Sequence, residues 1–181
     1  MIALANLGQN KKGMLWVNDL PDLNYKIINR LTTSIDIEKC MYIKPTSIAL
    51  ELLLSRRNMS NYAFLGIKFV PKNIKNLNIR VNVSSDEDEI LSDNIAMKSD
   101  TVFLGIPNEY AEAIIDTTNK IVREHSLFPC GDLEFFIGAH GEIGSSKFSF
   151  LKVTEIILKL LIIEPENKSI NQIENLVKFG L

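Results

Sequence analysis

The sequence contains few of the residues on which catalytic and metal centres most often depend. Its 181 residues include only two histidines, His125 and His140, and two cysteines, Cys40 and Cys130. The two cysteines are far apart and lack the ligand spacing of a zinc site, and two cysteines do not form the framework of a disulfide-rich secreted domain. We therefore expect no metal, no cofactor and two reduced cysteines in or near the core.

The sequence also lacks a strong charge of one sign and a long apolar run. The net charge is −2 and the pI is about 5.8, whereas proteins that bind duplex DNA usually carry a strongly basic surface. The longest strongly apolar stretch, residues 156–163, is far shorter than the ~20 residues that a helix needs to cross a bilayer. Residues 1–7 are apolar but precede Lys11 and Lys12, which is the reverse of a signal peptide. We expect a cytoplasmic protein with neither duplex DNA nor a membrane as its partner.

The remaining composition is that of a chain with a packed core. Hydrophobic residues make up 46% of the sequence, and a chain of this length can bury roughly 70% of its unfolded surface. The basic residues are concentrated early, since residues 1–58 hold eight Lys and Arg against five Asp and Glu. Within them, the pairs Lys11-Lys12 and Arg56-Arg57 are candidate contacts for an anionic partner. The alternative is that both pairs are solvated ends of structural elements.

Hydrophobic periodicity predicts mixed elements in the first third of the chain. Residues 13–17 have the pattern of a short strand, and residues 40–43 have that of another. Leu23, Ile27, Ile28 and Leu31 would share one face of a helix that begins near Pro21. A second helix is predicted over residues 48–55, where six of the eight residues are apolar.

The rest of the chain predicts strands followed by two long helices. Strands are expected over residues 62–70, 77–83, 101–104 and 133–137, and helices over residues that begin near Pro107 and over 146–163. The acidic residues 86–89 are interpreted as a solvated loop tip, with a cation site as the alternative. The order β-β-β-α-β-α is typical of a two-layer α+β sandwich, with a mainly antiparallel sheet and two helices on one face. We divide the chain into an N-terminal α/β extension (1–58), this domain (59–165) and a tail (166–181).

Three segments in this order resemble domain IV of elongation factor G. Its first helix is introduced by an Ile-Pro-x-Glu-Tyr segment, and its second begins with Ser-Ser before a buried Phe. This chain has Ile106-Pro107-Asn108-Glu109-Tyr110 and Ser145-Ser146-Lys147-Phe148-Ser149-Phe150, and an earlier strand that ends at Pro71. The resemblance covers about residues 60–163.

The resemblance implies the fold of the second domain of small-subunit ribosomal protein five, which contains an unusual left-handed crossover. It does not extend to a GTPase, because the chain has no Gly-x-x-x-x-Gly-Lys-[Ser/Thr] loop. In the family, two loops at the tip of domain IV reach the ribosomal decoding centre. The Gly- and Arg-rich pattern of the first loop is absent from Asn58-Met59-Ser60-Asn61, and Gly141 stands at the second loop's histidine position, one residue after His140.

The glycine-containing stretch 138–146 is the most suggestive chemical cluster. His140 and Glu142 could act as an acid–base pair, and Ser145 or Ser146 could serve as a nucleophile. No Gly-x-Ser-x-Gly elbow accompanies them, and the alternative is a tight turn followed by a helix-capping serine.

These features lead to three functional hypotheses. The first is a non-catalytic interaction module that binds the ribosome or RNA, with Lys11, Lys12, Arg56, Arg57, Lys68 and Arg80 as phosphate contacts. The second is a protein–protein module, such as an immunity or assembly protein. The third is an enzyme with its site at residues 138–146. We favour the non-catalytic module.

Overall fold

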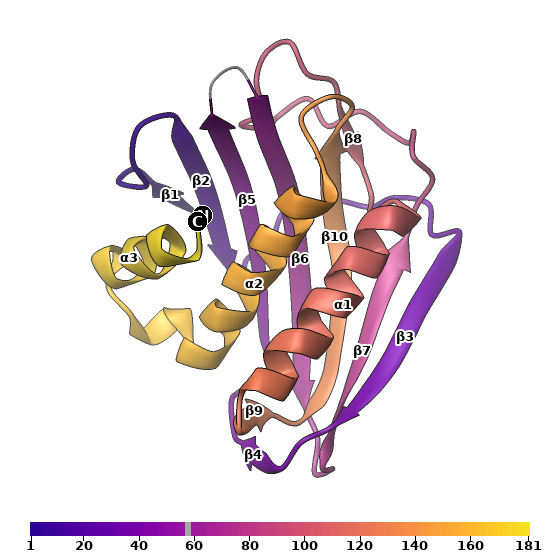
Figure 1. The fold of residues 1–181 in the computed structure, drawn as a ribbon, viewed down its shortest axis with the longest axis vertical. Coiled ribbons are helices and arrows are strands. Elements are labelled where there is room, and N and C mark those ends of the chain that lie inside the picture. The colour runs from indigo at the N-terminus through magenta and orange to yellow at the C-terminus, as the bar shows by residue number, and fades with distance from the viewer. Residues whose placement is uncertain (57–58) are drawn as a thin grey trace.

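The computed structural model describes residues 1–56 and 59–181, and the side chains of residues 1–54 and 61–181. Its centre is a mixed, mostly antiparallel sheet of eight strands in the order β1-β2-β5-β6-β10-β7-β3, with β8 also paired to β10 (Figure 1). Its strands are β1 (Ile2–Leu4), β2 (Lys11–Val17), β3 (Asn29–Asp36), β5 (Thr46–Arg56), β6 (Met59–Pro71), β7 (Asn76–Val83), β8 (Val102–Leu104) and β10 (Gly131–Gly141). A separate parallel pair joins β4 (Lys39–Met41) to β9 (Leu127–Pro129).

Three α-helices, α1 (Asn108–Glu124), α2 (Lys147–Ile163) and α3 (Ile170–Gly180), complete the fold. Helix α1 begins after Pro107, and α2 begins at Ser146, whose side chain accepts a hydrogen bond from the Ser149 amide. A short 3-10 helix, η1 (Pro165–Asn167), connects α2 to α3. The sheet and helices confirm the prediction of an α+β protein.

Helices α1 and α2 lie side by side on the same face of the sheet (Figure 1). Strands β7 and β10 are adjacent and parallel, and α1 connects them. In Figure 1 the chain ascends β7, descends α1 in front of the sheet and ascends β10 on the left of β7. This is a left-handed crossover, whereas about 98% of such connections are right-handed.

The two faces of the sheet carry separate apolar clusters. The larger lies between the sheet and the helices and includes Phe69, Phe135 and Phe150. The smaller lies on the back face, where Tyr62 and Phe64 are covered by parts of the two long connections, residues 18–28 and 84–101. Strands β1, β2, β3 and β5, from the predicted N-terminal extension, belong to the same sheet as β6, β7 and β10.

Both helices predicted in the first third are wrong, and the described part of residues 1–58 contains only strands and connecting segments. The stretch 48–55 lies in β5, a central strand whose two faces are both buried, so its apolar residues run without alternation. Residues 20–28 have no regular secondary structure, and Leu23 packs on the back-face cluster. Leu31 belongs to edge strand β3.

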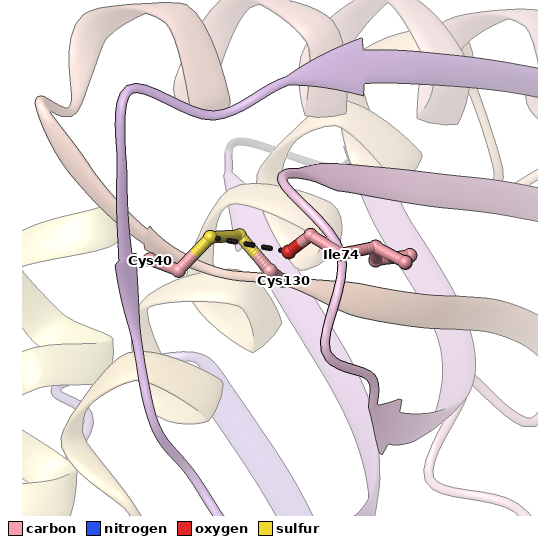
Figure 2. The surroundings of a disulfide bond; sticks show 3 residues. All are labelled: Cys40, Ile74 and Cys130. Carbon is pink, nitrogen blue, oxygen red and sulfur yellow. Dashed lines mark hydrogen bonds between the residues drawn. A yellow bond between two sulfur atoms is a disulfide. The ribbon is translucent and has the colours of Figure 1, made fainter.

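The prediction of two reduced cysteines is also wrong. Cys40 and Cys130 form a disulfide with a Cα–Cα distance of 5.4 Å across a sequence separation of 90 residues (Figure 2). They lie in and just after the paired strands β4 and β9, which bring the two segments together. The Cys40 sulfur also lies 3.5 Å from the carbonyl oxygen of Ile74. The pair joins the connection after β3 to the start of β10.

In the described ranges, 1–56 and 59–181, no helix is long and apolar enough to span a membrane.

Candidate interaction surface at one end of the sheet

Strand register gathers most of the predicted binding residues at one end of the sheet. Lys11, at the start of β2, is paired with Leu54 near the end of β5. The amide of Tyr62, near the start of β6, donates to the Gly144 carbonyl at 2.7 Å, which brings the β10–α2 turn to the same end. We call this end the tip: residues 10–12, the loop 95–100 and the turn 142–148. Arg56 ends β5 here, whereas Arg57 lies outside the described residues.

Asp100 fastens the two loops of the tip together. Its carboxylate oxygens accept hydrogen bonds from the amides of Ile143 and Gly144, each at 3.0 Å. The space beside Gly141 is occupied by the same carboxylate, since a Cβ at Gly141 would lie 2.0 Å from Asp100 Oδ2. This contact therefore requires glycine at position 141.

The two candidate serines are engaged in holding the turn. Ser145 Oγ donates to the Tyr62 carbonyl at 2.6 Å and accepts from the Gly141 amide at 2.8 Å. Ser146 Oγ accepts from the Ser149 amide at 3.2 Å as the N-cap of α2. These bonds support the helix-capping alternative for the stretch 138–146.

His140 is buried, and both of its ring nitrogens face backbone carbonyls. Nε2 lies 2.8 Å from the Asp86 oxygen, and Nδ1 lies 3.4 Å from the Gly105 oxygen. The ring packs edge-on against Tyr110 at 5.8 Å. Glu142 is exposed on the following turn. With its nitrogens turned to the backbone, His140 ties the loop after β7 to β10, and this arrangement favours a structural role.

Beside His140 is a small acidic hollow of about 210 Å³, to which the loop 84–89 contributes Asp86 and Glu87. Glu109 and Glu142 complete its acidic lining. No group of three or more His, Cys, Asp or Glu side chains in the described part of the chain is placed to hold a metal ion.

A second hollow, of about 490 Å³, opens at the tip between β2 and the loop 95–100. Leu53, Ala96 and Met97 give it an apolar lining, and Lys12 and Lys98 contribute a cation from each side. Both lysines are exposed. Lys98 was not among the residues predicted from the sequence, because no basic neighbour marks it.

The tip also carries exposed apolar side chains. Ile143 is 80% exposed at the top of the turn, and Phe148 is 52% exposed in the first turn of α2. Lys147 lies exposed between them in sequence. Aromatic and aliphatic groups next to cations make this end suited to binding another molecule.

Lys68 and Arg80 lie elsewhere, on the open back face of the sheet. They occupy one cross-strand row with Glu134, which is opposite Lys68 on one side and Arg80 on the other. Arg80 Nη1 lies 3.9 Å from Glu134 Oε1, and Lys72, just after β6, forms a salt bridge with Asp132. The hydrogen bond from Lys72 and that from Asn78 lower the pKa of Asp132. The cations of this face are therefore opposed by carboxylates.

A buried carboxylate on the back face escaped the sequence analysis. Glu51 is 3% exposed, and its Oε1 accepts from the Tyr62 hydroxyl at 2.7 Å and from the Ile95 amide at 3.0 Å. Burial raises the pKa of Glu51, and burial together with the Glu51 charge raises the pKa of Tyr62. The available signal was a single acid inside the apolar run of β5. This pair anchors the loop 95–100 to the sheet just below the tip.

Comparison with protein families, curated proteins and solved structures finds no match for this chain.

Proposed function

We propose that the protein is a non-catalytic interaction module that binds the ribosome or RNA through its tip. The observation that carries this proposal is the pairing of Lys12 and Lys98 across an apolar hollow, with Phe148 exposed on the same end. Two exposed cations beside one hollow suit phosphate groups, and exposed aromatic rings suit unstacked bases. The cytoplasmic location expected from the sequence is part of this proposal, and the Cys40–Cys130 disulfide is then an exception in a compartment where such bonds are rare.

In the resemblance to domain IV of elongation factor G, the family's binding loops also lie at one tip of the domain, which supports the tip as the binding end. We include in the proposal that residues 59–165, which contain β6-β7-β8-α1-β10-α2, have the fold of the second domain of small-subunit ribosomal protein five. The two helices on one face and the left-handed β7–α1–β10 crossover support that kinship. The family's ribosome-contacting loops would match residues 58–61 and the turn after β10. The end of β5 at Arg56, the start of β6 at Met59 and that turn all belong to this end.

A filter-binding titration with single-stranded RNA at several salt concentrations tests the proposal. Because phosphate contacts release counterions, the binding constant should fall steeply as salt rises. RNA binding that is absent at low salt, together with no association with purified ribosomes, would rule out this function.

A protein partner is the second candidate, and one observation favours it. Ile143, at 80% exposure, offers an aliphatic anchor that contributes little to RNA recognition. Replacing Ile143 with Ser removes the apolar anchor without adding charge, so it should weaken capture of a protein partner and leave RNA affinity almost unchanged. Recovery of only ribosomes or RNA in a pull-down from the native host would argue against this candidate.

A further inference from the structure

Strand β3 is an uncovered edge of the sheet. It pairs with β7 on one side, and Figure 1 shows no element along its other side. The opposite edge strand, β1, has only three residues, whereas β3 has eight and contains no proline. A long open edge presents unpaired backbone donors and acceptors and is a template for another strand.

Alternate residues of β3 turn their backbone groups outward. Asp36 is opposite Asn76, so Ile37 is opposite Lys75 when the register is continued by one residue. The Ile37 amide donates to the Lys75 carbonyl at 2.8 Å, so these two residues are a hydrogen-bonded pair. Because hydrogen-bonded and non-bonded pairs alternate along an antiparallel ladder, the odd-numbered residues of β3 bond to β7. The outward residues are therefore Arg30, Thr32, Ser34 and Asp36. In agreement, the Arg30 amide donates to Asn29 Oδ1 and not to β7.

The outward residues are complementary to a second copy of themselves. If two β3 strands run antiparallel about a two-fold axis at Thr33, Arg30 lies opposite Asp36 of the second copy, and Thr32 lies opposite Ser34. All four outward residues then meet outward residues, so every pair can exchange backbone hydrogen bonds. On the helix side, Leu31 lies opposite Ile35 of the second copy.

Arg30 and Asp36 are free to make these contacts. Both are exposed, and neither forms an ion pair within the described part of the chain. Their side chains lie on the back face, since Arg30 Nε is 3.3 Å from Asn82 Oδ1. Two-fold symmetry doubles each contact, giving two cross-strand pairs of opposite charge.

We infer that the occupant of the β3 edge is a second copy of this chain, paired antiparallel about Thr33 to form a homodimer with one continuous sheet. Shifting the register by two residues in either direction leaves one outward residue of each copy without an outward partner and separates Arg30 from Asp36. The self-complementary charges therefore select one register.

Sedimentation equilibrium over a range of concentrations tests the dimer, with circular dichroism as a check of folding. The wild-type chain should dimerise reversibly. Thr32→Pro should abolish the dimer and leave the monomer folded, because the lost amide faces outward and not toward β7. Thr32→Val keeps that amide and should retain the dimer. A monomeric wild type, or a folded Thr32→Pro variant that still dimerises, would overturn the inference.

Charge reversal tests the register. Arg30→Asp and Asp36→Arg each place like charges opposite one another twice, and each should weaken dimerisation roughly tenfold or more. Mixing the two variants restores both opposite-charge pairs in a heterodimer. Recovery of the dimer only in the mixture supports the pairing about Thr33. The register about Thr33 is contradicted if each variant alone dimerises as strongly as the wild type, or if mixing the variants does not restore the dimer.

Discussion

The Asp100 carboxylate accepts a hydrogen bond from the Gly144 amide at 3.0 Å and thereby joins the two loops of the tip. The same carboxylate accepts from the Ile143 amide. Because two loops that are distant in sequence meet at this group, the shape of the proposed binding end depends on one side chain.

Replacing Asp100 with Ala should loosen the tip and destabilise the protein by about 1–3 kcal/mol, since the change leaves two backbone donors without their acceptor. The free energy of unfolding from a denaturant titration measures this effect. Asp116→Ala, which removes an exposed carboxylate on α1, is the matched control and should change stability by less than about 0.5 kcal/mol. Equal stability of the two variants would contradict the role given to Asp100.

Glu51 should lower the stability of the protein as pH rises, which is the reverse of the usual effect of a carboxylate. Its pKa is raised above the ordinary value of 4.5, chiefly by burial, so the folded state holds the proton more tightly than the unfolded state. The resulting stabilisation is present below about pH 4.5 and is lost as pH rises through the raised pKa. Glu51→Gln preserves an acceptor for Tyr62 and Ile95 and should be more stable than the wild type near neutral pH.

Unfolding titrations of the wild type and of Glu51→Gln between pH 4 and pH 8 measure the difference in their stability. The advantage of Glu51→Gln should shrink as pH falls. Glu174 is an internal comparison, because hydrogen bonds from Asn6 lower its pKa, and its stabilisation is lost as pH falls. A wild type that gains stability relative to Glu51→Gln as pH rises would show that the sign is wrong.

The Cys40–Cys130 disulfide should stabilise the fold by about 2–4 kcal/mol, because it restricts the unfolded chain over a long loop. Unfolding curves with and without reductant measure this, and a thiol assay on the unreduced protein should detect no free cysteine. The double variant Cys40→Ser, Cys130→Ser should match the reduced wild type. Two titratable thiols in unreduced protein would refute the bond.

The second half of the fold was predictable because its patterns are strongly periodic and well bounded. Leu77, Ile79, Val81 and Val83 alternate along β7 and are buried, and Pro107 and Ser146 mark the helix starts that the structure contains. Strand β5 was not predictable in this way, since a strand buried on both faces has the same apolar content as a buried helix.

The disulfide and the tip depend on contacts between distant segments. Cys40 and Cys130 are 90 residues apart, and only the pairing of β4 with β9 brings them together. Lys11, Lys12 and Arg56 were identified as candidate contacts, but the contribution of Lys98 follows from the path of the loop 95–100 across the end of the sheet. The path of this loop cannot be predicted from its local sequence.

The most direct test of the proposed function is RNA affinity, measured by fluorescence anisotropy at low salt, for the double variant Lys12→Glu, Lys98→Glu. Lys68→Glu and Arg80→Glu on the back face form the matched double control, because they change net charge equally. The account predicts that the tip variant loses at least roughly tenfold in affinity and that the control loses much less. Equal losses in both double variants would contradict binding at the tip.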